Sequence, residues 1–233
     1  MLIYQKGVFF MSSNRSSTMN ARTMVSLGML TAIAYVVMYL SKLLPQVMGF
    51  LQFDLKDTII CIGGFIFGPL AAAMVSIVVA LIEMFTVSDT GIIGMIMNVL
   101  ATCAFCCTAS FVYKRKHTAA GAVVGLTLGA LVLTAVMLLW NYLVTPLYML
   151  IDRAVVAGML LPVFLPFNLV KGGMNMAAIL LLYKPVVGAL RKAHLVAPSE
   201  NGKKGKLNLG FLLFSLALLA TFVLLMLVLA GLL

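Results

Sequence analysis

Residues 161–184 read LPVFLPFNLVKGGMNMAAILLLYK, an apolar run with one charged residue, Lys171, between its ends. A helix needs about 20 apolar residues to cross a bilayer, so this run predicts a transmembrane helix. The rest of the chain has the same character, because 64% of its 233 residues are hydrophobic and only 9% are charged. Soluble domains carry about 25% charged residues, so the composition excludes soluble enzymes, disordered proteins and coiled coils.

Further stretches on both sides of this run are apolar enough to form membrane helices. One of them continues without interruption over 56–87, which is too long for one span, and Gly68-Pro69 lies where a helix has to break and turn. We therefore expect two short helices there, within an all-α, polytopic membrane helical bundle. The expected segments are 23–44, 56–68, 70–87, 92–113, 119–145, 161–184 and 208–233.

The charged residues predict the orientation of these helices. The chain has 16 Lys and Arg against 6 Asp and Glu, a net charge of +10, and in a membrane protein such an excess marks cytoplasmic loops, not a nucleic-acid partner. A cytoplasmic N-terminus places most basic residues inside: Lys6, Arg15, Arg22, Lys114, Arg115, Lys116, Lys184, Arg191, Lys192, Lys203, Lys204 and Lys206. The outer loops then hold Lys42, Lys56, Arg153, Asp54, Asp57, Asp89 and Asp152.

The chain divides into four parts on this interpretation. We expect a cytoplasmic N-terminal segment at 1–22, a membrane domain at 23–192, a polar cytoplasmic linker at 193–207 and an additional transmembrane helix at 208–233. The first residues lack the small-residue cleavage site of a secretory signal, so we expect no cleavable signal peptide.

Lys171 is the most informative residue of the central run. A charged side chain inside a membrane helix costs about 2.5 to 3.5 kcal/mol, and such residues face a cavity or a partner. On a helix, Asn168, Lys171 and Asn175 share one face because they are three and four residues apart. This polar stripe suits a ligand rich in carbonyl and ring-nitrogen acceptors. The alternative is that Lys171 extends to an interface or pairs with a carboxylate on another helix.

Two further Asn residues lie at a comparable depth in the expected spans. Asn98 is about two turns into 92–113, and Asn141 is near the outer end of 119–145. Each could simply make an interhelical hydrogen bond, worth about 0.6 kcal/mol. Because Asn98, Asn141, Asn168 and Lys171 all lie in the outer halves of their helices, we prefer a shared polar cavity.

The first outer loop, residues 45–57, is apolar where an exposed loop should be polar. We expect it to form a lid in which Phe50 and Leu51 cover a flat apolar ligand and Gln52 offers an amide. Asp54 or Asp57 could equally be the N-cap of the next helix.

These residues and their order resemble those of the riboflavin-specific S components, the substrate-binding subunits of energy-coupling-factor (ECF) transporters. The shared elements are Leu51-x-x-Asp54-x-x-Asp57, Phe67-Gly68-Pro69, Asn98, Asn141-Tyr142-x-x-x-Pro146-Leu147-Tyr148 and Pro166-Phe167-Asn168-x-x-Lys171-Gly172. The resemblance implies a six-helix membrane domain in a bacterial cell membrane that binds riboflavin at the outer face. It also implies assembly with a transmembrane T protein and two ABC-type ATPase subunits, since an S component hydrolyses nothing itself.

The resemblance also suggests roles for particular residues. It implies that Asn141, Asn168 and Lys171 bind the flavin ring, with Phe50, Leu51 and Gln52 packed over it. In this family the first helix docks on the T protein through small residues, which here suggests Gly28 and Ala32. The seventh helix at 208–233 departs from the family pattern, and we expect it to take no part in binding.

Small residues also recur at Gly121-x-x-x-Gly125-x-x-x-Gly129, where internal helix packing is the stronger interpretation.

Other functions fit the sequence less well. Enzymatic activity is not expected, because His117 and His194 lie beside cytoplasmic basic clusters, away from the outer cavity. Cys103-x-x-Cys106-Cys107 has metal-like spacing but sits in an apolar helix without a second ligand pair, so we expect neither a metal nor a cofactor.

The open alternatives are an S component for another vitamin and an autonomous secondary transporter. The latter usually shows inverted repeats and an acidic ion site, whereas Glu83 is the only acid well inside a span and could pair with Lys171.

Overall fold

The computed structural model describes residues 21–88, 90–193 and 209–233. The expected N-terminal segment and linker, including His194 and the Lys residues at 203–206, therefore lie almost wholly outside the described residues. Six helical segments are long and apolar enough to cross a membrane: Ala21–Ser41, Pro69–Thr86, Gly91–Lys116, Ala119–Met149, Arg153–Leu190 and Leu209–Leu229.

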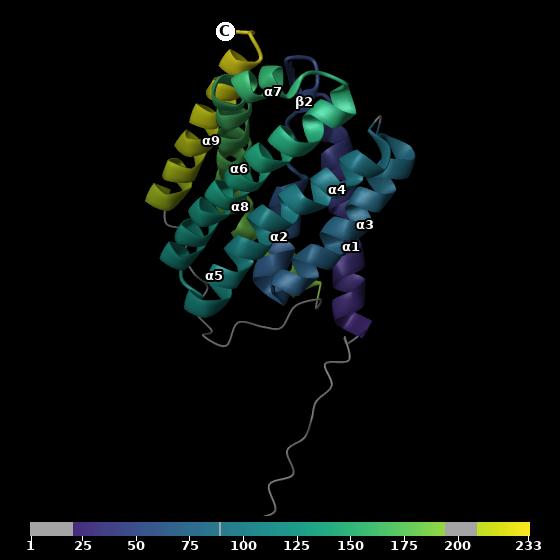
Figure 1. The fold of residues 1–233 in the computed structure, drawn as a ribbon. Coiled ribbons are helices and arrows are strands. Elements are labelled where there is room, and N and C mark those ends of the chain that lie inside the picture. Colours follow the sequence, from purple (N-terminus) through teal and green to yellow (C-terminus); the bar gives the residue numbers. More distant parts are fainter. Residues whose placement is uncertain (1–20, 89, 194–208) are drawn as a thin grey trace, which may run out of the picture.

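The elements follow one another in a simple order (Figure 1). They are α1 (Ala21–Ser41), β1 (Gln46–Val47), β2 (Leu51–Gln52), α2 (Lys56–Phe67), α3 (Pro69–Thr86), α4 (Gly91–Thr102), α5 (Thr108–Lys116), α6 (Ala119–Met149), α7 (Arg153–Met159), α8 (Leu165–Lys192) and α9 (Leu209–Leu229). Two π-helical turns, Cys103–Cys107 and Leu160–Phe164, join α4 to α5 and α7 to α8. Figure 1 places the two strands, α7 and the C-terminus at one end of the bundle, and the start of α1 at the other.

The expected break in the long apolar run occurs at Gly68 and Pro69. Gly68 has a φ of +98°, its N–H donates to the carbonyl of Gly64 over 2.8 Å, and Pro69 begins α3. Proline is favoured at the first position of a helix because the missing N–H would be unpaired there. α2 has only 12 residues, a length of about 18 Å, so it is too short to cross the bilayer alone. Its residues from Lys56 to Phe65 are all buried, which makes α2 the centre of the bundle.

The outer loop expected between 145 and 161 is much shorter in the structure. α6 continues to Met149 and α7 begins at Arg153, so Arg153 lies in a helix and only residues 150–152 connect the two. Asp152 caps α7 by accepting a hydrogen bond from the N–H of Ala154. The helical path continues through Pro162 because the π-helical turn Leu160–Phe164 absorbs the hydrogen-bonding defect that a proline introduces.

The glycine ridge on α6 packs inside the bundle, as expected. A Cβ on Gly125 would lie 2.8 Å from the carbonyl oxygen of Ala109, and one on Gly129 would lie 2.7 Å from that of Phe105. α5 and the preceding turn therefore approach α6 closely because these positions carry no side chain.

The first helix presents a different surface. Gly28 and Ala32 are both exposed on α1, and a Cβ on Gly28 would meet nothing within 4 Å. These two positions are accordingly accessible on the outside of the described bundle.

Candidate ligand-binding site

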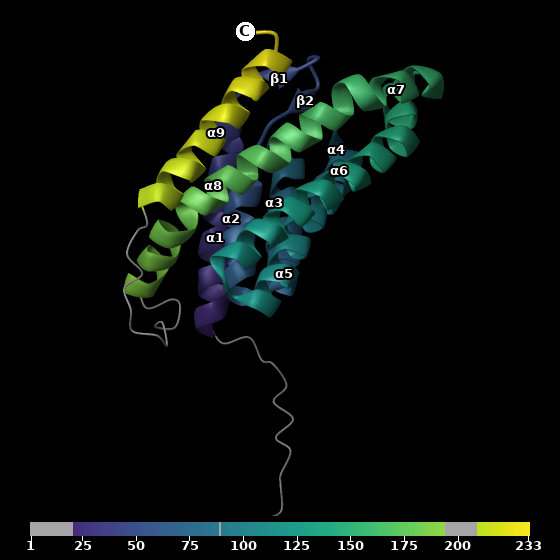
Figure 2. The ribbon, with the colours of Figure 1, turned by 90° about the vertical axis from the view of Figure 1, so that its left-hand side faces the viewer.

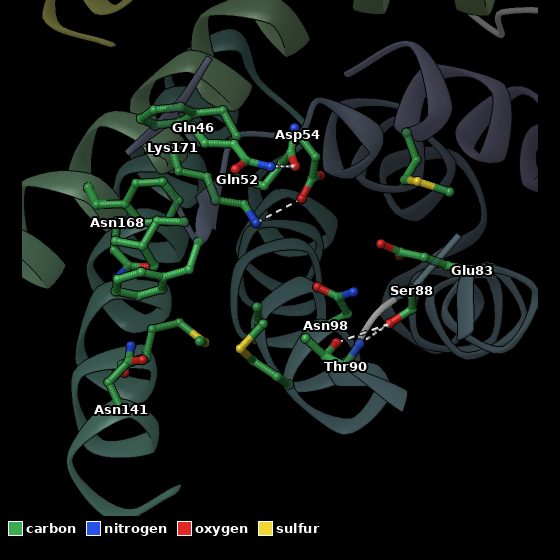
Figure 3. Close-up of a pocket in the computed structure, with 18 of the residues that line it drawn as sticks. Gln46, Gln52, Asp54, Glu83, Ser88, Thr90, Asn98, Asn141, Asn168 and Lys171 are labelled. Atoms are coloured by element: carbon green, nitrogen blue, oxygen red, sulfur yellow. Dashed lines mark hydrogen bonds and ion pairs between the residues drawn. The ribbon is translucent and has the colours of Figure 1, made fainter. Parts of the chain in front are cut away.

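A cavity of about 310 Å³ lies beneath the segment that contains β1 and β2, and side chains of α3, α4, α6 and α8 complete its wall (Figure 3). This volume falls at the lower end of the range of small-molecule sites. The structure brings together around it every binding residue expected from the sequence: Phe50, Leu51, Gln52, Asn98, Asn141, Asn168 and Lys171. These residues are up to 121 positions apart in the chain, so the fold, not local sequence, assembles the site.

A smaller cavity of about 110 Å³ adjoins the first, and Phe50, Leu51, Asn141 and Tyr148 line both. Apolar side chains of α4 and α6, among them Ile93 and Trp140, form much of its wall. The first cavity has a wall of mixed polar and apolar character, and the adjoining one is mostly apolar. Such a combination suits a ligand with a flat apolar part and a polar edge.

Two asparagines of the polar stripe on α8, Asn168 and Asn175, have different roles. Asn168 donates from Nδ2 to the carbonyl of Phe164 over 2.7 Å, and its Oδ1 accepts no hydrogen bond from another described residue. Asn175 is one turn further along, and its Nδ2 donates to the carbonyls of Asp54 and Lys171 over 3.0 and 3.1 Å. Its Oδ1 accepts from Thr58 over 2.8 Å, so both N–H groups and one lone pair of this amide are occupied. Asn168 therefore has an acceptor available for a ligand, while Asn175 holds α8 to the chain around α2.

Lys171 is 8% exposed and donates from Nζ to Oδ2 of Asp54 over 2.8 Å. This ion pair contradicts two expectations from the sequence, that Asp54 caps the next helix and that Glu83 pairs with Lys171. Asp54 does not cap α2, since the N-cap residue is Leu55 and no side chain caps that helix, and Lys171 pairs with Asp54 instead of Glu83. The Lys171 ammonium group has two further N–H donors, so the ion pair leaves it able to bind a ligand.

Asp54 precedes α2 and lies outside the spanning helices. Burial alone raises the pKa of this carboxyl, but the ammonium groups of Lys171 and Lys56 outweigh burial and lower the pKa to about 2. Asp54 is therefore ionised at neutral pH. Its Oδ1 is buried and makes no hydrogen bond to a described residue, and Asp54 lines the cavity. Asp54 is thus a candidate site residue that sequence reasoning assigned to a different role.

A second ion pair lies beside the first. Lys56 donates to Glu83 over 2.7 Å, and Asp57 accepts from Thr102 over 2.6 Å. Lys56 and Asp57, which the sequence interpretation counted with the outer loops, are 3% and 1% exposed and belong to a buried helix. They are in the first turn of α2, which the bundle surrounds. The charge of Lys56 is paired with Glu83, and Oδ1 of Asp57 accepts from Thr102, while Oδ2 of Asp57 is buried without a hydrogen bond to a described residue.

The segment that covers the cavity, residues 42–53, is called the lid below. Its two short strands pair in antiparallel fashion, with Val47 opposite Leu51, and the turn between them is formed by Met48 and Gly49 at positive φ. The amide of Gln52 donates to the carbonyls of Ser41 and Lys42 over 3.3 Å each and accepts from Gln46 over 3.0 Å. Gln52 therefore stabilises the lid itself, and its amide is less available to a ligand than the sequence suggested.

Aromatic side chains join the lid to α8 and to the π-helical turn that precedes it. The rings of Phe53 and Phe167 lie 4.6 Å apart, and Phe50 meets Phe164 edge-on at 6.2 Å. Phe53 is completely buried, whereas Phe50 remains 38% exposed. The lid is thus anchored at its end next to Asp54 and more open near Phe50.

The opposite wall comes from α3, α4 and the turn between them (Figure 3). Asn98 lines the cavity and makes no hydrogen bond to another described residue, so its amide is free to face a ligand. Ser88 and Thr90 also line the cavity, and their hydroxyl groups lie 3.0 Å apart. The polar stretch between two apolar spans could have identified these two residues, but the sequence interpretation did not use it.

Asn141 on α6 is 5% exposed and already partly engaged. Its Nδ2 donates to the carbonyl of Met137 over 2.7 Å, and its Oδ1 accepts from Thr145 over 2.9 Å. One N–H and one lone pair remain for a ligand. The alternative that Asn141 makes an interhelical hydrogen bond finds no support, because both partners belong to its own helix.

Comparison with known proteins places these features in a family. Residues 22–183 match the model of the family described as ECF transporter, substrate-specific component. The chain is 30% identical over 178 residues to riboflavin transporter RibU of Staphylococcus aureus (strain TCH60), covering 73% of this chain and 93% of that protein. It is 30% identical over 194 residues to riboflavin transporter FmnP of Bacillus subtilis (strain 168), covering 76% and 100%.

A solved structure shows the same fold. The S component of a bacterial ECF transporter superposes with a TM-score of 0.62 at 30% identity, covering 73% of this chain and 98% of that one. The family match extends over more than half of the chain and contains every residue that we assign to the cavity. The resemblance noted in the sequence is confirmed, and the protein is a multi-pass membrane protein that belongs to the substrate-specific S components of ECF transporters.

Proposed function

We propose that the protein binds riboflavin in the cavity beneath the lid and delivers it to an ECF-type importer. The observation that carries this proposal is the convergence of Asn98, Asn141, Asn168 and Lys171 on one cavity next to an apolar compartment. Riboflavin has a flat tricyclic ring that is apolar on both faces, a pyrimidine edge with carbonyls and ring nitrogens, and a hydroxylated side chain. The names of the curated relatives point to the same ligand.

The unoccupied hydrogen-bonding groups fit the pyrimidine edge. The Lys171 ammonium group and the Asn141 amide provide donors, and Oδ1 of Asn168 provides an acceptor for a ring N–H. The lid and the apolar side chains of α4 and α6 would enclose the ring faces. The riboflavin is cargo and not a cofactor, and we propose no catalytic activity for the chain.

Transport then depends on partners. We propose that the chain assembles with a membrane-embedded T protein and two ABC-type ATPase subunits, and that Gly28 and Ala32 on α1 contribute to docking because both are exposed small residues. We further propose that the N-terminus is cytoplasmic, since the basic residues at the end of α5 lie opposite the lid and would remain inside. The lid would then face the outside of the bacterial cell.

The visible absorption spectrum of the purified protein tests the choice of ligand. We expect a yellow preparation whose extracted small molecule has the mass of riboflavin. A colourless preparation that retains a different vitamin would show an S component of another specificity. An autonomous secondary transporter is not favoured, and uptake by cells that lack the ATPase subunits would be needed to support it.

A further inference from the structure

The last helix, α9, packs lengthwise against α8 (Figure 2). Its buried and half-buried side chains recur at intervals of three and four residues, which form one face of a helix. They are Phe211, Leu212, Ser215, Leu218, Leu219, Phe222, Val223, Met226, Leu227, Leu229 and Ala230. The family match ends at residue 183, so α9 is an addition to the part of the chain shared with other S components.

The far end of α9 reaches the base of the lid. Met226 is 3% exposed and belongs to the same buried cluster as Val47 and Phe53 of the lid and Phe167 of α8. Figure 2 shows this end of α9 beside β1. One apolar cluster therefore contains parts of the lid, the helix that carries Asn168 and Lys171, and the added helix.

The ring of Phe222 packs on α8 at Gly173, and this packing site is called the seat of Phe222 below. A Cβ on Gly173 would overlap the ring of Phe222, so the ring occupies the space that the missing side chain leaves. Gly173 is two residues from Lys171, and Phe222 packs against the cluster that contains Phe53, the neighbour of Asp54. The ring of Phe222 therefore packs beside the helix that carries Lys171 and against a cluster that contains the sequence neighbour of Asp54, the two members of the ion pair.

We infer that Phe222 is a positioning residue for the lid: by filling the seat at Gly173 and supporting the cluster of Val47, Phe53 and Met226, it holds the lid closed over the cavity and slows ligand release. This inference rests on the proposed function in one respect, namely that the ligand whose release is measured is riboflavin. It replaces the expectation that the seventh helix takes no part in binding.

The test compares Phe222→Ala with Phe214→Ala in the full-length protein. Both substitutions remove a phenylalanine from α9, but Phe214 is 54% exposed and lies outside the face that packs on α8. Hydrogen exchange of the ligand-free protein follows the lid, and stopped-flow fluorescence follows the dissociation of riboflavin. We expect Phe222→Ala to accelerate exchange in the lid and to raise the dissociation rate between about 2-fold and 30-fold, with Phe214→Ala like the wild type.

Several outcomes would overturn the inference. Unchanged lid exchange would do so, and so would acceleration of equal size in α2 and α6, because that pattern indicates general destabilisation. If Phe222→Ala does not fold, Phe222→Leu and Met226→Ala provide the same comparison with smaller losses of side-chain volume. Hydrogen exchange in the lid at the wild-type rate in both of these variants would contradict the inference. Failure of the wild type to bind riboflavin would refute the proposed function alone, since the exchange measurement needs no ligand.

Discussion

The ammonium group of Lys171 donates to the carboxylate of Asp54 across 2.8 Å, and the side chain of Asn175 donates to the backbone carbonyl of the same Asp54. Two hydrogen bonds from α8 thus fix the chain at the point where the lid ends and α2 begins. The ion pair lies in the wall of the cavity, so one contact both fastens the lid and orients a ligand-binding group.

Removal of one member of this pair should destabilise the protein. Lys171→Met leaves Asp54 buried without its nearest cation, and the loss of one partner of a buried ion pair costs about 3 to 5 kcal/mol. The double variant Asp54→Asn with Lys171→Met should recover much of that loss, because no unpaired charge remains. Unfolding of the wild type, Lys171→Met, Asp54→Asn and the double variant by a denaturing detergent provides the measurement, and additive losses in the double variant would contradict an interaction between the two residues.

Ligand binding should distinguish the two buried lysines. Lys56→Met also breaks a buried ion pair, but Lys56 does not line the cavity, whereas Lys171 does. Lys171→Met should weaken riboflavin binding at least about tenfold, which corresponds to about 1.4 kcal/mol. Lys56→Met should lower thermal stability with a smaller change in affinity. Equal losses of affinity in both variants would show that Lys171→Met weakens binding by destabilising the protein and not by removing a ligand contact.

Phosphorylated flavins should bind less tightly than riboflavin. Both Asp54 and Glu83 line the cavity, and their carboxylates balance the positive charges of Lys171 and Lys56. A phosphate group brought near these carboxylates meets like charge, which lowers affinity. In a competition assay we expect FMN to be at least about tenfold weaker, and Glu83→Gln to narrow the difference. Equal competition by FMN would remove charge as the basis of selection.

The two groups of glycines should respond differently to substitution. Gly129→Ala forces a methyl group against the carbonyl of Phe105, and overpacking of this kind costs about 1 to 3 kcal/mol. Gly28→Ala meets open space and should leave the stability of the isolated protein unchanged. Thermal unfolding of the two variants measures the difference.

Docking can be tested at the same position on α1. Gly28→Leu should reduce co-purification with the T protein while riboflavin binding persists. Gly158→Leu on α7 is the matched control, because Gly158 is also exposed with no atom within 4 Å of its Cβ position. Normal assembly of the Gly28→Leu protein would eliminate this part of α1 as a docking surface.

The sequence predicted the membrane class, the break at Gly68 and seven of the residues that line the cavity, because hydropathy, proline and intramembrane polar residues can be recognised locally. The partners of Lys171 and Gln52 could not be predicted in the same way. Lys171 contacts Asp54, which is 117 residues away in the chain, and Gln52 bonds to carbonyls of a lid whose path depends on its packing. Charges near an apolar run suggested an outer loop, yet Lys56 and Asp57 are buried since their partners come from α3 and α4.

The measurement that tests the account most directly is an equilibrium titration of the purified protein with riboflavin, followed by quenching of flavin fluorescence, with Asn168→Ala as the comparison. We predict saturable one-to-one quenching by the wild type with a Kd in the nanomolar range, equivalent to about 12 kcal/mol, and at least about tenfold weaker binding by Asn168→Ala, which lacks the free acceptor in the cavity. Absence of quenching by the wild type, or full affinity in the Asn168→Ala protein, would contradict riboflavin binding at this site.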